Sequence, residues 1–301
     1  MKKLLSLSCS LLVCGSVVLG ACATPPPPEA PEYPETYYTV SEENVGTSVA
    51  ANDSRYNANK QEYVGGALDG KVIYWLGSSV TYGSASEGQS MADYLAALTG
   101  CISVKDAISG TTIFDDNAST ATGRDSYTRR LVNSTVYDKE QQVDAFICQI
   151  STNDARNDRL NKRGEITGAE VLTSSEFDKA TTLGGVEFII TYVTETWGCP
   201  VYFYSGSYFG DEGTRKSTNP KGSEYAKLVD EVKQVAEKYN AVDGFEVGVI
   251  DLFNDEEFNA VASDAYYSWA TSDAIHPKKA GYLQWWTPYF ESYLTYYLTM
   301  V

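Results

Sequence analysis

Three side chains in this sequence could together form a nucleophilic centre: a serine, the single histidine and a nearby aspartate. Ser79 lies in the segment 74–83, YWLGSSVTYG, where a run of β-forming residues gives way to glycine and two serines. His276 is the only histidine of the chain, and Asp273 precedes it in the segment SDAIHP. A serine hydroxyl attacks an ester once a base removes its proton, and a carboxylate can orient that base. These residue types therefore point to acyl-transfer chemistry.

Each of these features also has a purely structural interpretation. The stretch 77–79 could form an ordinary strand-to-helix turn, because glycine permits a positive φ and serine satisfies the free N–H groups at a helix start. Asp273 and His276 could belong to a surface turn ended by proline. Other segments of the chain are therefore needed to choose between the catalytic and the structural interpretation.

The elements that would position these residues follow an alternating pattern from residue 66 onward. Short apolar runs separated by helices indicate a parallel sheet that is buried on both faces. The expected fold class is therefore α/β, a three-layer α/β/α sandwich around a five-stranded, mainly parallel sheet. The sequence predicts strands over 71–77, 101–110, 143–151, 199–206 and 245–253, and helices over 90–100, 186–198, 223–240 and 279–298.

Polar segments follow the predicted strands at the point where each strand ends. In open parallel sheets, functional groups gather at the carboxyl ends of the strands. We therefore expect these segments to converge on one edge of the sheet, together with the SDAIHP segment. They are GSS at 77–79, SGTT at 109–112, STND at 151–154 and SGSYFG at 205–210.

The segments LGSSVTYG, SGTT, STND and DAIHP resemble, in this order, the four sequence blocks of the SGNH hydrolases, also called GDSL-type esterases and lipases. The resemblance spans about residues 70–285 and implies the flavodoxin-like fold of that family. It implies that Ser79 is the nucleophile and that Asp273 and His276 are its partners. It also implies an oxyanion hole formed by the backbone N–H groups of Ser79 and Gly110 and by the side-chain amide of Asn153.

Two positions depart from the family pattern. Ser78 stands where the family usually has aspartate, and Ser151 stands where the third block usually begins with glycine. Neither position is catalytic in the family scheme, so the implied machinery is complete. The chain also lacks the Gly-x-Ser-x-Gly motif of the α/β-hydrolases, which favours the SGNH fold over that one.

The resemblance implies a carboxylic ester hydrolase, and the expected substrate is an O-acetyl ester on a carbohydrate. An alternative from another class is a catalytically inactive lipoprotein that binds glycans or adheres through the same scaffold. A Ser79→Ala variant separates the two, because a binding protein keeps its affinity and an esterase loses turnover. Aspartates and glutamates are scattered without ordered ligand spacing, so we expect neither a metal nor another cofactor.

The composition limits the partners. The formal net charge is −17, which repels nucleic acid and anionic polymers and favours a neutral or cationic ligand. Outside the N-terminal segment, the cysteines are Cys101, Cys148 and Cys199, with no CxxC spacing. Such a set predicts neither a disulfide framework nor a zinc site, and Cys101 and Cys148 are expected to be buried.

The N-terminus is typical of a bacterial lipoprotein. Residues 1–21 combine a short basic start with an apolar stretch, and the sequence LGAC ending at Cys22 resembles a lipobox. We expect Cys22 to be lipidated, which anchors the protein to the outside of the cell membrane; cleavage as an ordinary secretory signal is the alternative. Residues 22–36 include six of the ten prolines and predict a semi-rigid tether. An irregular extension, 37–65, then precedes a hydrolase domain over 66–301.

Overall fold

The computed structural model describes residues 49–115, 125–168, 173–262 and 266–299. The predicted signal segment 1–21, the tether 22–36 with Cys22, and residues 37–48 of the extension lie outside the described residues. Among the described helices, none combines the length and the apolar character that crossing a bilayer requires.

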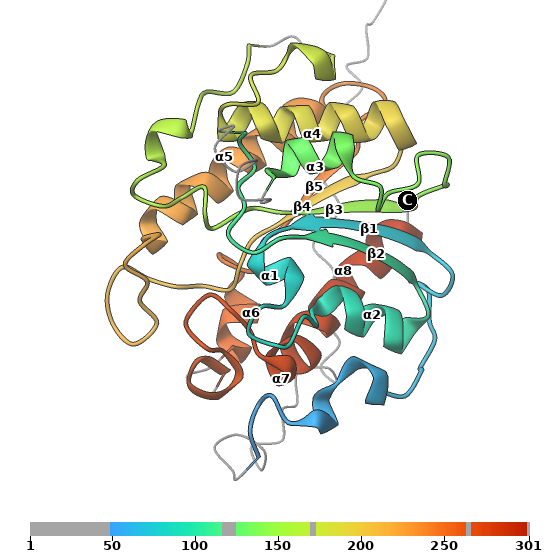
Figure 1. Cartoon of the computed structure of the whole chain (residues 1–301), viewed down its shortest axis with the longest axis vertical. Coiled ribbons are helices and arrows are strands. Elements are labelled where there is room, and N and C mark those ends of the chain that lie inside the picture. The colour runs from blue at the N-terminus through green and yellow to red at the C-terminus, as the bar shows by residue number, and fades with distance from the viewer. Residues whose placement is uncertain (1–48, 116–124, 169–172, 263–265, 300–301) are drawn as a thin grey trace, which may run out of the picture. The chain divides into compact units, whose positions relative to one another are not determined.

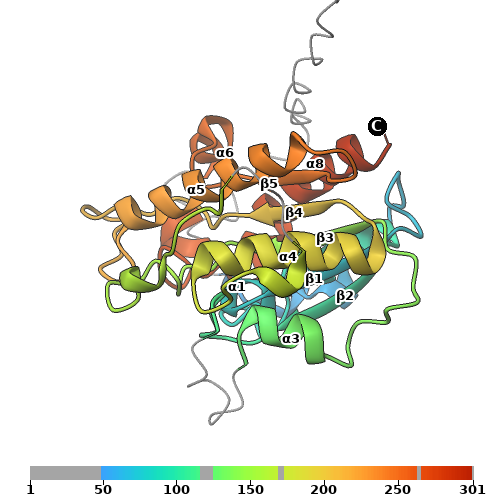
Figure 2. The same ribbon diagram turned by 90° about the horizontal axis from the view of Figure 1, so that it is seen from above.

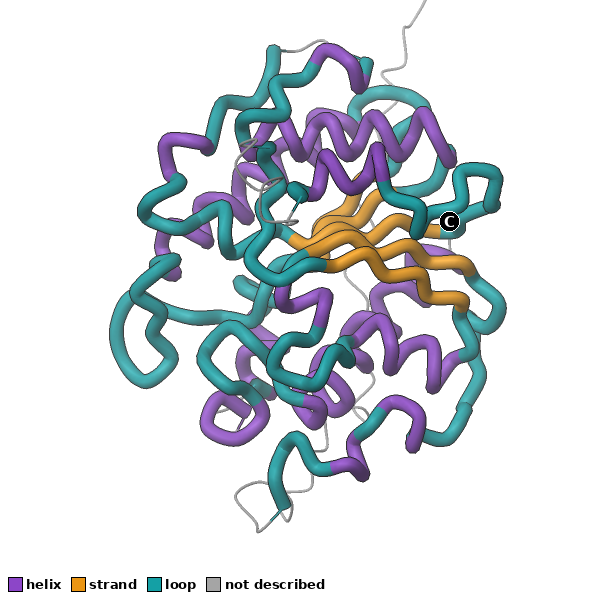
Figure 3. Tube along the Cα trace, viewed as in Figure 1, coloured by secondary structure: helices purple, strands orange, loops and turns teal. Residues whose placement is uncertain are grey.

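A five-stranded sheet forms the centre of the domain, and all of its strand pairings are parallel (Figures 1 and 3). The strand order is β2-β1-β3-β4-β5. This confirms the predicted five-stranded parallel sheet, although each strand is shorter than the run that predicted it. The strands are β1 (Val72–Gly77), β2 (Ile102–Ala107), β3 (Ala145–Gln149), β4 (Val201–Tyr204) and β5 (Val247–Ile250).

The central strands are apolar because they bury side chains on both faces. Along β1, Tyr74 and Leu76 join one hydrophobic cluster, whereas Ile73 and Trp75 join the other. Successive side chains of a strand point to opposite faces, so a run without polar residues fits a sheet covered on both sides. The two clusters are the two halves of the core.

Helices cover both faces, which confirms the three-layer sandwich (Figures 1 and 2). Side chains of α3, α4 and α5 pack in one cluster, and those of α1, α2, α6 and α8 pack in the other. The helices are α1 (Ser79–Tyr82), α2 (Met91–Thr99), α3 (Tyr127–Asn133), α4 (Thr182–Trp197), α5 (Gly222–Asn240), α6 (Glu256–Val261), α7 (Lys279–Gly281) and α8 (Thr287–Thr299). The described residues also form two π-helical segments, Tyr266–Ala270 and Tyr282–Trp286, and four 3-10 turns, Ser54–Tyr56, Ala58–Lys60, Leu160–Lys162 and Ser174–Glu176.

The predicted closing helix over 279–298 differs in one respect. Its path runs from α7 through the π-helical segment Tyr282–Trp286 into α8. Trp285 and Trp286 are both buried, and the indole N–H of Trp286 donates to the hydroxyl of Tyr266 at 2.7 Å. The wider turn therefore lies where two bulky neighbouring indoles enter the core.

The described part of the N-terminal extension packs against the C-terminal segment. The indole N–H of Trp269 donates to the carbonyl of Val49, and the backbone N–H of Lys279 donates to the side chain of Asn52 at 3.0 Å. The Lys279 ammonium is buried and pairs with Glu87 at 2.6 Å. These contacts fix the segment from which α7 begins.

The three cysteines of the domain are all buried free thiols. Cys101 and Cys148 therefore behave as the small hydrophobic residues that were expected. Burial raises the pKa of the Cys148 thiol well above its ordinary value, which keeps it protonated and unreactive.

The strand order creates a crevice at the carboxyl end of β1. β2 pairs with one edge of β1 and β3 with the other, so the chain winds in opposite directions from this strand. Such a switch point leaves space between the loops that follow the neighbouring strands. The segments after β1, β2 and β3 therefore meet there.

Candidate active site

The three residues singled out at the start form one chain of hydrogen bonds. Ser79 is the first residue of α1, and its Oγ lies 2.8 Å from Nε2 of His276. On the other side of the ring, Nδ1 of His276 lies 2.9 Å from Oδ2 of Asp273. A carboxylate beside Nδ1 favours the tautomer whose Nδ1 carries the hydrogen, which leaves Nε2 free to accept the proton of Ser79.

A short closed loop holds the aspartate and the histidine together. Thr271 and Pro277 form an antiparallel bridge, and the backbone N–H of Ser272 donates to the carbonyl of His276 at 2.9 Å. Inside this loop, the backbone N–H of His276 donates to Oδ1 of Asp273 at 2.7 Å. The spacing Asp-x-x-His thus allows one carboxylate to bind both the backbone and the ring of the histidine.

The same contacts keep Asp273 ionised. Partial burial pushes the pKa of its carboxyl upward, but the hydrogen bond from His276 and its charge, together with two backbone N–H groups, outweigh that effect. The pKa of Asp273 therefore lies below its ordinary value. At neutral pH the residue is a carboxylate that can stabilise an imidazolium.

The turn that presents Ser79 is built around Gly77, Thr81 and Gln149. A Cβ on Gly77 would lie 1.7 Å from Oγ1 of Thr81, so only glycine fits. The buried Oε1 of Gln149 accepts from the backbone N–H of Ser78 at 2.9 Å and from the Thr81 hydroxyl at 2.9 Å. One side chain at the end of β3 therefore satisfies the polar groups on both sides of the serine.

The loops after β2 and β3 are joined next to the serine. Gly110 has a φ of +83°, which glycine adopts without strain and which turns the chain sharply after β2. The side-chain amide of Asn153 donates to the carbonyl of Thr111 at 3.0 Å, and the hydroxyl of Ser151 donates to the same carbonyl at 3.2 Å. An amide nitrogen carries two hydrogens, so one N–H of Asn153 anchors the side chain and the second can serve a substrate.

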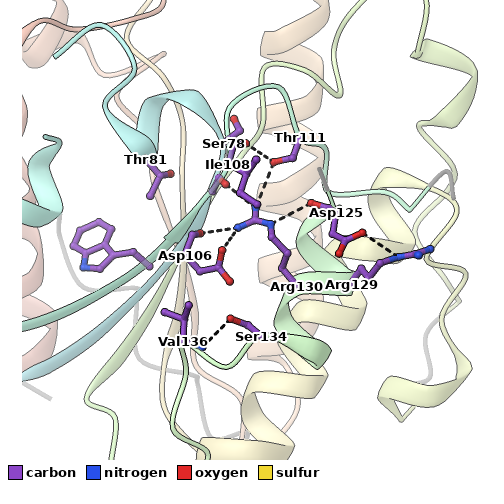
Figure 4. Close-up of polar contacts among 12 residues, drawn as sticks. Ser78, Thr81, Asp106, Ile108, Thr111, Asp125, Arg129, Arg130, Ser134 and Val136 are labelled. Atoms are coloured by element: carbon purple, nitrogen blue, oxygen red, sulfur yellow. Dashed lines mark hydrogen bonds and ion pairs between the residues drawn. The ribbon is translucent and has the colours of Figure 1, made fainter. Parts of the chain in front are cut away.

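A buried arginine ties the ends of β1 and β2 to helix α3 (Figure 4). The guanidinium of Arg130 donates to the carbonyl of Gly77 at 2.7 Å, to the carbonyl of Asp106 at 2.9 Å and to the hydroxyl of Thr111 at 3.3 Å. It also forms an ion pair with the Asp106 carboxylate. The serine turn and the loop that holds Gly110 therefore share one rigid support.

Asp154 supports the same loops from inside the core. Its fully buried carboxylate accepts from the backbone N–H of Ile113 at 3.0 Å and from the hydroxyl of Thr182 at 3.0 Å. Burial raises the pKa of Asp154 to about 6, because its hydrogen bonds only partly offset the loss of water. This residue holds the loop after β2 and is closed off from a substrate.

A small, mainly polar pocket is lined by Ser79, Asn153, Asp273 and His276, and its volume is about 220 Å³. The serine is 8% exposed, and it is part of the lining of this pocket. A larger pocket of about 470 Å³ lies beside Tyr208, and its described lining contains neither Ser79 nor His276.

The structure thus brings together most of the predicted site. Ser79, Asp273, His276 and Asn153 share the pocket, and Gly110 lies in the loop to which Asn153 is bonded. Cys22 lies outside the described residues. The supporting residues Gln149 and Arg130 were not predicted from the sequence. Within the described residues, no group of three histidine, cysteine or acidic side chains could hold a metal ion.

Comparison with known proteins identifies the family. The family model of GDSL-like lipases and acylhydrolases matches residues 43–286. The chain belongs to this family. The resemblance seen in the four segments is therefore confirmed, and the match begins within the predicted extension 37–65. A search among curated proteins finds no match.

Solved structures share the GDSL-like fold. A protein from Lactobacillus plantarum has 20% identity and a TM-score of 0.53, and the match covers 75% of this chain and 97% of that one. Another structure has 20% identity and a TM-score of 0.55, with 76% and 98% covered. A carbohydrate acetylesterase family member from Sinorhizobium meliloti has 15% identity and a TM-score of 0.47, with 77% and 100% covered. The first two matches, whose TM-scores are above 0.5, concern the fold alone at these identities.

Proposed function

We propose that this GDSL-like hydrolase cleaves esters through an acyl-enzyme on Ser79. The observation that carries the proposal is the 2.8 Å contact between Oγ of Ser79 and Nε2 of His276. His276 takes the hydroxyl proton as Oγ forms a bond to the ester carbonyl carbon. The imidazolium, stabilised by Asp273, then gives this proton to the departing alcohol as its bond to carbon breaks. A water molecule repeats the sequence on the acyl-enzyme and releases the acid.

Hydrogen-bond donors must stabilise the negative charge that develops on the carbonyl oxygen during the reaction. We assign them to the backbone N–H groups of Ser79 and Gly110 and to the free N–H of the Asn153 side chain. The support from Gln149 and Arg130 holds these groups before the substrate arrives, so that little reorganisation is needed during the reaction.

The proposed substrate is a short acyl ester, an O-acetyl group, on a carbohydrate. A pocket of about 220 Å³ is smaller than the roughly 300–1,000 Å³ of typical ligand pockets. Its lining is rich in hydroxyl, amide and charged side chains, such as Thr152, Ser217 and Asn219. A small polar pocket suits an acetyl group on a hydroxylated alcohol better than a long acyl chain.

We also propose that the protein acts outside the cell membrane, anchored by a lipid on Cys22. The support is the sequence alone: the apolar segment before Cys22 and the proline-rich tether after it. Expression of the full chain with a clickable fatty acid tests this, and a Cys22→Ala variant is the control. Labelling of the wild type but not of the variant is expected; equal absence of label would contradict lipidation.

The activity is tested with the full chain in detergent against p-nitrophenyl acetate, p-nitrophenyl palmitate and acetylated xylan, beside Ser79→Ala. We expect hydrolysis of the two acetyl esters, weak or no hydrolysis of the palmitate, and loss of all turnover in the variant. Binding of the glycan by folded wild-type protein without any turnover would instead support the inactive glycan-binding alternative.

A further inference from the structure

Two cationic side chains line the same pocket as the proposed nucleophile. Arg156 and Lys216 face the cavity that holds Ser79 and His276. We infer that this pocket recognises an ester whose alcohol part carries an anionic group, such as the carboxylate of an acidic sugar. The inference rests on the proposed esterase function and names a narrower substrate class for it.

Within the described residues, ion pairs neutralise little of the positive charge of these two side chains. Lys216 takes part in none of the ion pairs among the described residues. Among the described residues, the ion pair of Arg156 is with the exposed carboxylate of Asp158, through Nε at 3.3 Å. Among the described residues that line the pocket, the one carboxylate is that of Asp273, and it is already bound to His276. The described lining of the pocket therefore contains two cationic side chains and one carboxylate that is bound to His276.

The charge of the pocket lining is therefore opposite in sign to the net charge of the whole chain. The net charge is −17, and on that basis the sequence favoured a neutral or cationic ligand. Two cations in the pocket that holds the nucleophile give this part of a strongly acidic protein a locally positive charge. They would offset the repulsion that an anionic substrate meets on approach.

The two cations come from loops that are bonded to each other. Arg156 follows β3 in the turn that carries Asn153, and Lys216 lies in the connection between β4 and α5. The backbone N–H of Asn157 donates to the side chain of Asn219 at 2.9 Å, which links the two loops. Arg156 and Lys216 therefore line one pocket because the loops that carry them are hydrogen-bonded to each other.

The loop that carries Lys216 is itself closed. Gly210 and Lys216 form a β-bridge, and the backbone N–H of Ser217 donates to the carbonyl of Gly210 at 3.0 Å. The Lys216 side chain therefore starts from a fixed backbone, unlike a lysine on an open surface helix. A guanidinium binds carboxylate and phosphate oxygens in pairs, and an ammonium adds a point charge. Both fit an anionic group on the alcohol.

The test uses matched esters that differ in one charge. The probes are 4-acetoxybenzoate, which is anionic, 4-acetoxybenzamide, which is neutral, and 4-acetoxyphenyl phosphate, which separates a phosphate from a carboxylate preference. The measured quantity is the ratio of kcat/KM for an anionic probe to that for the neutral probe. The full-length variants are Arg156→Gln, Lys216→Gln and the double variant. Lys227→Gln is the control, because Lys227 is 64% exposed on α5 and lies outside the pocket.

We expect the double variant to lower the ratio by about 10-fold or more, and each single variant to lower it less. The control corrects for the change in net charge and should leave the ratio as in the wild type. An equal fall for both probes would overturn the inference, because the cations would then support the reaction itself. An unchanged ratio would overturn it too, while hydrolysis of the neutral probe would leave the proposed esterase function intact.

Binding gives a second readout that needs no turnover. In a Ser79→Ala background, the amide analogue 4-acetamidobenzoate should bind more tightly than neutral 4-acetamidobenzamide by calorimetry. Adding Arg156→Gln and Lys216→Gln should abolish that difference. Equal binding of both analogues before these changes would contradict the inference. If the folded wild type hydrolysed none of the probes, the esterase proposal would fail, and this binding experiment would still decide the charge preference.

Discussion

The side-chain carbonyl of Gln149 accepts a hydrogen bond of 2.9 Å from the backbone N–H of Ser78, the residue before the nucleophile. The same oxygen accepts from the hydroxyl of Thr81, two residues after the nucleophile. Gln149 ends β3 and is buried, so its position depends on the pairing of β3 with β1. The sheet register is thereby coupled to the direction of the Ser79 side chain.

We predict that Gln149→Ala lowers kcat by between about 10- and 100-fold, because the turn loses the acceptor that orients Ser79. Stability should fall by about 1–3 kcal/mol, since buried donors are left without a partner. Steady-state kinetics and urea unfolding measure the two effects. Gln142→Ala, at an exposed position, is the control. Unchanged kcat in folded Gln149→Ala would remove this residue from the positioning of the serine.

Gly77→Ala should destabilise the protein by about 3 kcal/mol or more. Its Cβ would lie 1.7 Å from Oγ1 of Thr81 in a fully packed turn, so the serine turn must shift. Thermal unfolding and ester hydrolysis should both show the damage. Gly168→Ala, where nothing lies within 4 Å of the added Cβ, should behave as the wild type. Equal stability of the two variants would show that the turn can relax.

Asn153→Ala should lower kcat by about 100-fold or more with little change in KM. The amide donor stabilises charge that develops only in the transition state, so substrate binding does not depend on it. Initial-rate kinetics on p-nitrophenyl acetate separate the two parameters, with the exposed Asn133→Ala as the control. A rise in KM at constant kcat would place Asn153 in ground-state binding.

The buried carboxyl of Asp154 should make stability depend on pH. Its pKa is raised from 3.8 to about 6, so the folded protein holds this proton more tightly than the unfolded chain does. The free energy of unfolding should therefore fall as the pH rises from about 4 to about 6, by up to about 3 kcal/mol from this group, and then stay level.

Urea unfolding of the wild type and of Asp154→Asn across this pH range tests the assignment. The asparagine does not titrate. The free energy of unfolding of the variant should therefore lack the fall with pH that Asp154 causes, whatever its absolute stability. Parallel curves for the two proteins would show that Asp154 is not the group that titrates.

Much of the fold and the reacting groups could be predicted from the sequence because both have local signals. The run around Ile73 and Trp75 is apolar throughout, which a strand buried on two faces requires. Ser79, Asn153 and His276 each lie in a short segment of recognisable type. The helix α3 was missed because its seven residues give too little periodicity, although Ser126 caps it.

The support of the site could not be predicted, because it depends on contacts between distant segments. Arg130 reaches Gly77, 53 residues away, and nothing in its local sequence distinguishes it from a surface arginine. Gln149 contacts Ser78 across 71 residues through the sheet register. Arg156 and Lys216 line one pocket because two distant loops fold over it, and the net charge of the chain favoured a neutral or cationic ligand instead.

The most direct test of the central claim is to look for the acyl group on Ser79. The full chain is mixed with p-nitrophenyl acetate, quenched in acid within the first turnover, digested and analysed by mass spectrometry, beside Ser79→Ala. We predict one acetyl group on the peptide that carries Ser79, a burst of p-nitrophenol that matches the enzyme concentration, and neither in the variant. Equal turnover by Ser79→Ala, with no acetyl group on the wild-type peptide, would contradict the serine mechanism.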